Sequence, residues 1–276
     1  MPQDYFQARL ETSFSERASF SKNSAAKALF KLMDEKKTCL AVAVDVENCN
    51  KFFKIVNFVK DDTAIIKTHV DILSGYDDSF PGQLKDLAYD HSFLILEDRK
   101  FADIGNTAKL QYSGGIYKIC DWAHLVTVHS NPGPGVVEGL AAVVEEKKIK
   151  DPRGGLLLAQ MSSKGNLLDE NYTKKTVEMA GASPFSAGFI GTGSVPSDLH
   201  NLAAIAPSEF PILTPGIQFS AAGDSLKQQY CTPELAVENG SDCIIVGRGI
   251  IAAEDAKKAA QDYRKAAWQA YEKRVK

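Results

Sequence analysis

Cysteine is scarce in this chain of 276 residues, and nothing in its spacing suggests pairing. The five cysteines are odd in number, lie far apart and include no Cys-x-x-Cys pair. This spacing argues against a disulfide framework and favours reduced, mostly buried thiols. The five histidines are equally scattered and show no metal-ligand spacing. The sequence therefore predicts no metal site.

The sequence also lacks long apolar runs and a strong excess of charge. No segment approaches the length needed to span a bilayer, and no N-terminal apolar stretch resembles a signal peptide. The net charge is -3 and the pI is about 6.0, so no global field attracts nucleic acid or an acidic membrane. We therefore expect a cytosolic protein that binds neither nucleic acid nor membrane.

What the chain does contain is a series of short apolar segments that alternate with segments of helical spacing. Near-continuous apolar runs are typical of fully buried parallel strands. Eight strand-helix units in a chain of this length predict a single (β/α)8 TIM barrel, with a doubly wound open sheet as the structural alternative. The predicted strands are 39–46, 64–67, 93–96, 125–129, 156–161, 187–190, 210–214 and 243–246. The predicted helices are 50–60, 82–91, 136–148, 172–180, 198–205, 233–239 and 253–271, with a less regular crossover over 107–120.

The domain organisation is expected to be simple. Residues 1–23 are polar and are expected to form an N-terminal arm. A helix over about residues 24–35 is expected to cap the barrel floor. No repeat, low-complexity segment or Pro/Gly/Ser-rich linker divides the remainder, so residues 24–276 are assigned to one barrel domain.

The segment Glu97 to Thr107, EDRKFADIGNT, places Asp98, Lys100 and Asp103 directly after one of the apolar runs. Strand alternation would direct Asp98 and Lys100 to the same side, so both could face one substrate atom. Neighbouring acids favour a protonated ammonium, and Lys100 is therefore predicted to donate a proton. A surface ion-pair network is the alternative that this segment alone leaves open.

Polar residues also follow the other predicted strands. Active sites on this fold lie at the carboxyl ends of the strands. A purely structural role is open to each residue, and is the better interpretation of Asp45 or Ser162 alone, but their joint placement favours a site. The residues are Asp45, Lys67, Asp98 with Lys100, Ser162 with Ser163, Thr214-Pro215-Gly216 and Gly247-Arg248-Gly249.

The last two strands predict a phosphate site. Barrels commonly bind phosphate between the loops after strands seven and eight. In Gly247-Arg248-Gly249 the glycines allow backbone N–H groups to approach an anion, and the guanidinium adds a planar fork. The connection over 216–230 has a length typical of a lid, and Gln228 and Tyr230 near its end are predicted to contact the phosphate. A conformational role for the glycines and a plain surface loop are the alternatives.

Five segments occur together in an order and spacing shared with one enzyme family. They are Lys67 to Leu73 (KTHVDIL), Glu97 to Thr107, Thr214 to Gly216 (TPG), Gln228 to Tyr230 (QQY) and Ile244 to Gly249 (IIVGRG). Over nearly its whole length the chain resembles the eukaryotic, monofunctional form of the orotidine 5'-monophosphate decarboxylase family. Members of that family convert orotidine 5'-monophosphate to UMP in pyrimidine biosynthesis. The resemblance implies the same reaction here.

The resemblance also implies how the site is composed. Lys67, Asp98, Lys100 and Asp103 would form an alternating charge network, with Asp103 donated by the partner subunit of a homodimer. Lys100 would protonate C6 of the pyrimidine, and no metal or organic cofactor is expected. The substrate-binding residues would be Asp45 at the ribose with Lys67 and the partner's Thr107, Ser162 at the pyrimidine amide, Pro215 in the base pocket, and Gln228, Tyr230, Gly247 and Arg248 at the phosphate.

Three features depart from the pattern expected of the family. Gln160 stands where a glutamate is expected, Lys227 stands where a glycine is usual, and the segment 191–196 does not align clearly. None of them removes a member of the charge network, so activity is expected to persist.

Two other functions remain as alternatives. An aldolase would use Lys67 or Lys100 as a Schiff-base nucleophile, which requires an unprotonated amine that flanking acids disfavour. A catalytically silent sugar-phosphate-binding barrel is the second alternative, and the intact acid-lysine set argues against it. The chain is too short to add a phosphoribosyltransferase domain to the barrel, so a stand-alone decarboxylase is expected.

Overall fold

The computed structural model describes residues 4–219 and 231–275, in which eight parallel strands form a closed barrel. Each strand pairs with the next along the chain, and the last pairs with the first, which closes the sheet on itself. The predicted (β/α)8 barrel is therefore confirmed, and the open doubly wound sheet is excluded. The strands are β1 Leu40–Ala43, β2 Ile65–Thr68, β3 Leu94–Phe101, β4 Leu125–Val128, β5 Gly154–Leu158, β6 Ser186–Ile190, β7 Ile212–Thr214 and β8 Cys243–Val246.

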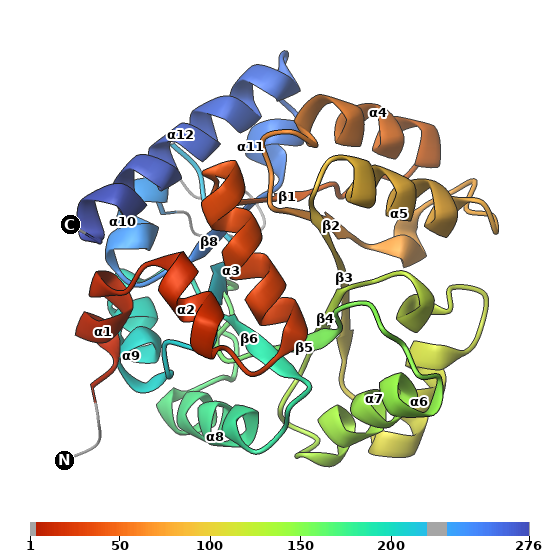
Figure 1. The fold of residues 1–276 in the computed structure, drawn as a ribbon, viewed down its shortest axis with the longest axis horizontal. Coiled ribbons are helices and arrows are strands. Elements are labelled where there is room, and N and C mark those ends of the chain that lie inside the picture. Colours follow the sequence, from red (N-terminus) through yellow and green to blue (C-terminus); the bar gives the residue numbers. More distant parts are fainter. Residues whose placement is uncertain (1–3, 220–230, 276) are drawn as a thin grey trace.

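Helices surround the barrel (Figure 1). The longer helices bury an apolar stripe, as α4 does with Phe52, Val56 and Val59. Within the described residues, no helix combines the length and the apolar character needed to cross a bilayer. The helices after β1 are α4 Cys49–Val59, α5 Phe80–Asp90, α6 Gly105–Ser113, α7 Gly135–Glu146, α8 Glu170–Gly181, α9 Pro196–Ile205, α10 Pro233–Glu238, α11 Arg248–Ile251 and α12 Ala256–Arg274, with short 3-10 turns η1 Val70–Ile72 and η2 Ile119–Asp121.

Two predicted helices have different bounds for local reasons. The crossover predicted over 107–120 is divided into α6 and η2, because Gly114 ends α6 in an extended conformation. The single helix predicted over 253–271 starts only at Ala256, because the side chain of Asp255 caps α12 by accepting from the Lys258 N–H. Local capping chemistry thus decided where these helices begin and end.

The helix α3, Ser24–Lys36, lies over the amino-terminal ends of the strands and is seen in front of them in Figure 1. Asn23 caps its first turn with the side-chain oxygen. The amide of Asn23 donates to the carbonyls of Arg153 and Pro184, just before β5 and β6. One side chain therefore starts α3 and fixes it to the barrel floor.

Within the described part of the expected polar arm, residues 4–23, the chain forms two short helices, α1 Phe6–Glu11 and α2 Phe14–Phe20, which bury two arginines. Arg9 and Arg17 each place Nη1 2.5 Å from a carboxylate oxygen of Asp242, which precedes β8. Arg274 of α12 contacts the same carboxylate at 2.8 Å. We call these four residues the floor network. Because Asp242 pairs with the buried guanidiniums of Arg9 and Arg17, this polar segment packs against the barrel.

Candidate active site

The carboxyl end of β3 carries two of the predicted site residues on distorted backbone. β3 continues to Phe101, beyond the predicted strand end at Leu96, and its pairing with β4 shifts register between Glu97 and Phe101. Lys100 has φ +52°, in the left-handed region that residues other than glycine seldom adopt. Such strain persists only where surrounding contacts hold it, and it clusters at functional sites. The direction of Lys100 therefore depends on a β-bulge, not on simple strand alternation.

Four charged side chains alternate in sign across the carboxyl end of the barrel. Lys67 Nζ lies 2.9 Å from Asp45 Oδ1 and 3.1 Å from Asp98 Oδ2. Lys100 Nζ lies 2.7 Å from Asp98 Oδ1. We call Asp45, Lys67, Asp98 and Lys100 the mouth network. The structure thus brings together predicted site residues from three neighbouring strands and the loops that follow them.

The mouth network holds its buried members in their charged forms. Burial favours a higher pKa for Asp98, but Lys67, His69 and Lys100 outweigh it and hold that pKa well below its usual range. Burial favours a lower pKa for Lys67, but Asp98 and Asp45 outweigh it and raise that pKa. Because a Schiff-base nucleophile must lose its proton, this environment makes Lys67 unsuited to aldolase chemistry.

Two contacts to Asp98 were not anticipated from the sequence. Thr127 of β4 donates its hydroxyl to Asp98 Oδ1 at 2.7 Å and accepts the Lys100 N–H at 2.9 Å. His69, which follows β2, places Nε2 3.3 Å from Asp98 Oδ2. The one available signal for Thr127 was a hydroxyl residue inside the apolar run LVTV. Thr127 therefore braces both the acid and the strained backbone of Lys100.

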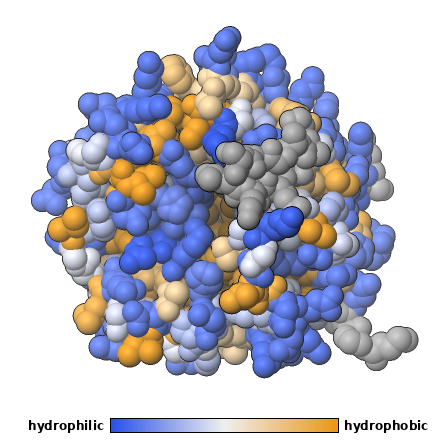
Figure 2. Space-filling view, turned by 180° about the vertical axis from the view of Figure 1, so that it is seen from behind, coloured by the Kyte–Doolittle hydropathy of each residue, from blue (hydrophilic) through white to orange (hydrophobic). Residues whose placement is uncertain are grey.

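Two cavities meet at the mouth network, on the face that Figure 2 shows with hydrophilic side chains around a central hollow. The smaller, of about 170 Å³, is mostly apolar, and the larger, of about 400 Å³, is lined about equally by polar and apolar atoms. Both are lined by Lys67, Asp98, Ser162, Pro215 and Ile245. The smaller adds Lys100, Thr127, Leu96, Leu158 and Ile190, and the larger adds Asp45, His69, Gly216, Gln218, Gly247, Arg248 and Gly249.

Several predicted residues lie apart from the mouth network or beyond the described part of the chain. Asp103 accepts the Ile104 N–H at 2.8 Å and contacts Gln111 Nε2 at 3.4 Å, and no ion pair joins it to a lysine within this single chain over residues 4–219 and 231–275. Thr107 lies in the first turn of α6 and is half-buried. Gln228 and Tyr230, with Lys227, lie outside the described residues.

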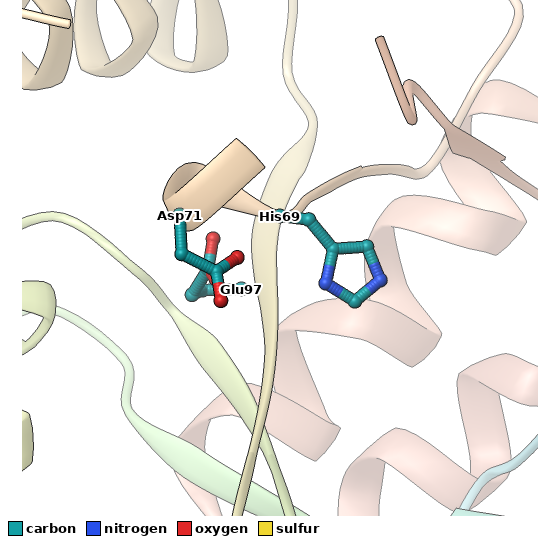
Figure 3. Close-up of side chains that lie close together, drawn as sticks. All are labelled: His69, Asp71 and Glu97. Carbon is teal, nitrogen blue, oxygen red and sulfur yellow. The ribbon is translucent and has the colours of Figure 1, made fainter. Parts of the chain in front are cut away.

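One cluster of metal-type ligand atoms lies next to the mouth network. In the described part of the chain, His69, Asp71 and Glu97 have ligand atoms within 4.8 Å of one another. Figure 3 shows the carboxylates of Asp71 and Glu97 close together, with the His69 ring extending away from them. Glu97 accepts from the Thr68 hydroxyl and the Val70 N–H, and His69 faces Asp98. Contacts within the protein therefore account for the positions of Glu97 and His69 in this cluster.

Comparisons with known proteins agree with this geometry. The family described as "Orotidine 5'-phosphate decarboxylase / HUMPS family" matches residues 38–263. Orotidine 5'-phosphate decarboxylase of Phycomyces blakesleeanus is 45% identical over 267 residues, 96% of each chain, and that of Schizosaccharomyces pombe is 43% identical over 271 residues, 97% of this chain and 98% of the relative. The crystal structure of orotidine 5'-monophosphate decarboxylase from Methanocaldococcus jannaschii complexed with the inhibitor BMP shares the fold, with a TM-score of 0.66 at 24% identity over 83% of this chain and 98% of that chain. The chain belongs to the orotidine 5'-phosphate decarboxylase family.

Proposed function

We propose that this protein is a carboxy-lyase that converts orotidine 5'-monophosphate to UMP in pyrimidine biosynthesis, without a metal or an organic cofactor. The observation that carries the proposal is the mouth network, which lies at the wall of a mostly apolar cavity in a chain of this family. A row of fixed charges beside an apolar pocket suits a decarboxylation, in which negative charge passes from the carboxylate to C6 and neutral CO2 leaves.

The chemistry requires electrostatic help because loss of CO2 from C6 leaves an sp2 carbanion with no adjacent carbonyl to delocalise it. A preorganised ammonium beside C6 lowers the energy of that negative charge. Lys100 suits this role because Asp98 and Thr127 hold its ammonium and backbone in place, while 35% of its side chain stays accessible. We propose that Lys100 then delivers the proton that replaces the carboxylate.

The remaining roles follow the two cavities. In the larger cavity, Asp45 would bind the ribose, and Gly247 and Arg248 would bind the phosphate. Gln228 and Tyr230, which lie outside the described residues, would also bind the phosphate. Ser162 and Pro215, which line both cavities, would contact the pyrimidine. Phosphate binding far from C6 would help to organise the charged groups, so orotidine lacking the phosphate should lose kcat as well as affinity.

We also propose a homodimer in which Asp103 and Thr107 complete the site of the partner subunit. Three large apolar side chains in and around α6 support an interface there, because Ile104, Leu110 and Ile116 are each more than half exposed. A twofold interface would repeat this surface on both subunits and make two equivalent sites.

Mixing two inactive variants tests the shared site. In a heterodimer of Lys100→Ala and Asp103→Ala chains, one site receives both substitutions and the other receives neither. Random exchange should therefore restore about a quarter of the parental activity if the dimer is twofold and shares Asp103. Heterodimers verified by mass spectrometry that stay inactive would contradict a shared site.

An ultraviolet assay of orotidine 5'-monophosphate loss tests the reaction itself. We expect turnover that is unchanged by a chelator. Binding without turnover would favour the silent sugar-phosphate-binding barrel, and irreversible borohydride labelling of Lys67 or Lys100 with a carbonyl substrate would favour the aldolase.

A further inference from the structure

We propose that the loop after β6, residues 191–195, positions Ser162 against Pro215, with Gln160 and Ser194 as the positioning residues. We call this loop the β6 bracket. The proposal rests on the function proposed above, in which Ser162 reads the pyrimidine amide and Pro215 lines the base pocket. It assigns a role to the two departures from the family pattern within the described residues, Gln160 and the segment 191–196.

Hydrogen bonds join the β6 bracket to the loop that contains Ser162. Ser194 donates its hydroxyl to the Ser162 carbonyl at 2.9 Å. Gln160 Oε1 accepts the Thr192 N–H at 3.1 Å, and the Ser194 N–H donates to Thr192 Oγ1 at 3.1 Å. Because the carbonyl of Ser162 is fixed, its peptide plane and the direction of its side chain are restricted.

The other side of the bracket packs against the start of the loop after β7. A Cβ at Gly193 would lie 2.8 Å from the carbonyl oxygen of Pro215 and 3.3 Å from that of Gly216. Only glycine allows the two backbones to approach this closely. Gly216 itself has φ +79°, so the loop after β7 leaves the barrel in a conformation that also favours glycine. The bracket therefore contacts loops from both of its neighbouring strands.

The amide oxygen and the amide nitrogen of Gln160 form hydrogen bonds with two different partners. Its oxygen accepts from Thr192, and its Nε2 donates to the Asp198 carbonyl at 2.5 Å, at the start of α9. An ionised glutamate would satisfy Thr192 but would place a second acceptor against the Asp198 carbonyl. The amide thus suits this bracket, and the two sequence departures contact each other. Gln160 also lines the smaller mouth cavity, so the contact borders the proposed base pocket.

The first test removes the contact between the bracket and the Ser162 loop. Ser194→Ala should lower kcat/KM for orotidine 5'-monophosphate by about three- to tenfold, the usual worth of one hydrogen bond. Ser194→Thr keeps a hydroxyl and should restore most of that loss. Ser21→Ala is a matched control, because it removes a hydroxyl-to-carbonyl bond of 2.8 Å to Glu209 at the barrel floor. It should leave kcat/KM unchanged.

A double-mutant cycle tests whether Ser194 acts through Ser162. Once Ser162→Ala has removed the proposed base contact, adding Ser194→Ala should change kcat/KM by less than about twofold. A full effect of Ser194→Ala in that background, or no effect in the parent enzyme, would overturn the bracket while leaving decarboxylation in place. A parent protein that turns over no orotidine 5'-monophosphate would overturn the proposed function, and the bracket with it.

Discussion

The two ends of this barrel each hold a charge network. The two networks differ in how much water reaches them and in the ratio of acidic to basic side chains. In the floor network, three guanidiniums surround Asp242, and the paired Arg9, Arg17 and Asp242 side chains are fully buried. In the mouth network, acids and lysines alternate one to one, and the outer members Asp45 and Lys100 remain 41% and 35% exposed. The same Coulomb attraction therefore operates in two different environments.

This difference in burial and charge balance suggests a structural role for the floor network and a chemical role for the mouth network. The floor guanidiniums also donate to backbone carbonyls, as Arg9 does to Ala206 and Phe210 and as Arg274 does to Val237 and Ser241. These bonds tie α1 and α12 to the barrel. The mouth network leaves charged groups facing cavities, where a ligand could compete for them. Substitutions at the two ends should consequently affect different properties.

The largest effect is expected at the mouth. Lys100→Ala should lower kcat/KM by on the order of 10³-fold or more, because it removes both the cation beside C6 and the proton donor. The free energy of unfolding should change little, since Lys100 is partly exposed. Lys22→Ala is a suitable control, because Lys22 pairs with Glu209 at the barrel floor at 3.5 Å. A Lys100→Ala enzyme with the parental rate would end the assignment of the proton donor.

The floor should show the opposite result. Asp242→Asn leaves three buried guanidiniums without their carboxylate and should cost about 3–5 kcal/mol of unfolding free energy. The kcat of the folded fraction should stay near the parental value. Chemical denaturation combined with turnover measurements would test this, and parental stability in the variant would refute it.

Stability at acidic pH should also depend on the Asp242 carboxylate of the floor network. The guanidiniums outweigh burial and hold the folded-state pKa of Asp242 well below its usual range. Its stabilisation is therefore present above the unfolded-state pKa near 4 and is lost as the pH falls further. Denaturant curves between pH 3 and 5 should show a steeper loss in the parent than in Asp242→Asn.

Glu97 provides a contrast with Asp242, because Glu97 is a buried acid that is not paired with a guanidinium among the described residues. Burial raises its pKa to about 8, although Thr68 and Val70 donate hydrogen bonds to it. Between the ordinary value near 4.5 and this value, the unfolded chain has lost a proton that the folded chain keeps. Stability should therefore fall as the pH rises through this window, by up to about 1.4 kcal/mol per pH unit from this group. Urea unfolding from pH 5 to 8 should show a flatter profile in Glu97→Gln, and equal slopes would count against the prediction.

The smallest effect is expected for a charge pair on the surface. Lys147 lies 2.7 Å from Asp121, but both side chains are well exposed. Asp121→Asn should change the unfolding free energy by no more than about 1 kcal/mol, because water screens such pairs. Thermal unfolding would measure it, and a loss as large as that of Asp242→Asn would show that burial is not what separates the two networks.

Much of the fold followed from local patterns in the sequence. The eight apolar runs correspond to β1–β8, and most strand ends lie within two or three residues of the prediction. Less predictable was the length of β3, because its charged carboxyl end does not look like a buried strand. The bulge and the Thr127 hydrogen bonds stabilise the β3 backbone around Lys100. Thr127 lies 27 residues after Lys100, so no local pattern reveals this contact.

The sequence by itself determined the barrel and the end of it at which Asp45, Lys67, Asp98 and Lys100 lie. Buried parallel strands have a simple apolar signature, and strand direction decides which end receives the residues that follow. Only the tertiary structure decided which polar residues beyond the expected charge network contact one another. The partners of Arg9, Arg17, His69 and Ser194 lie on other elements, and no local pattern in the chain encodes such distances.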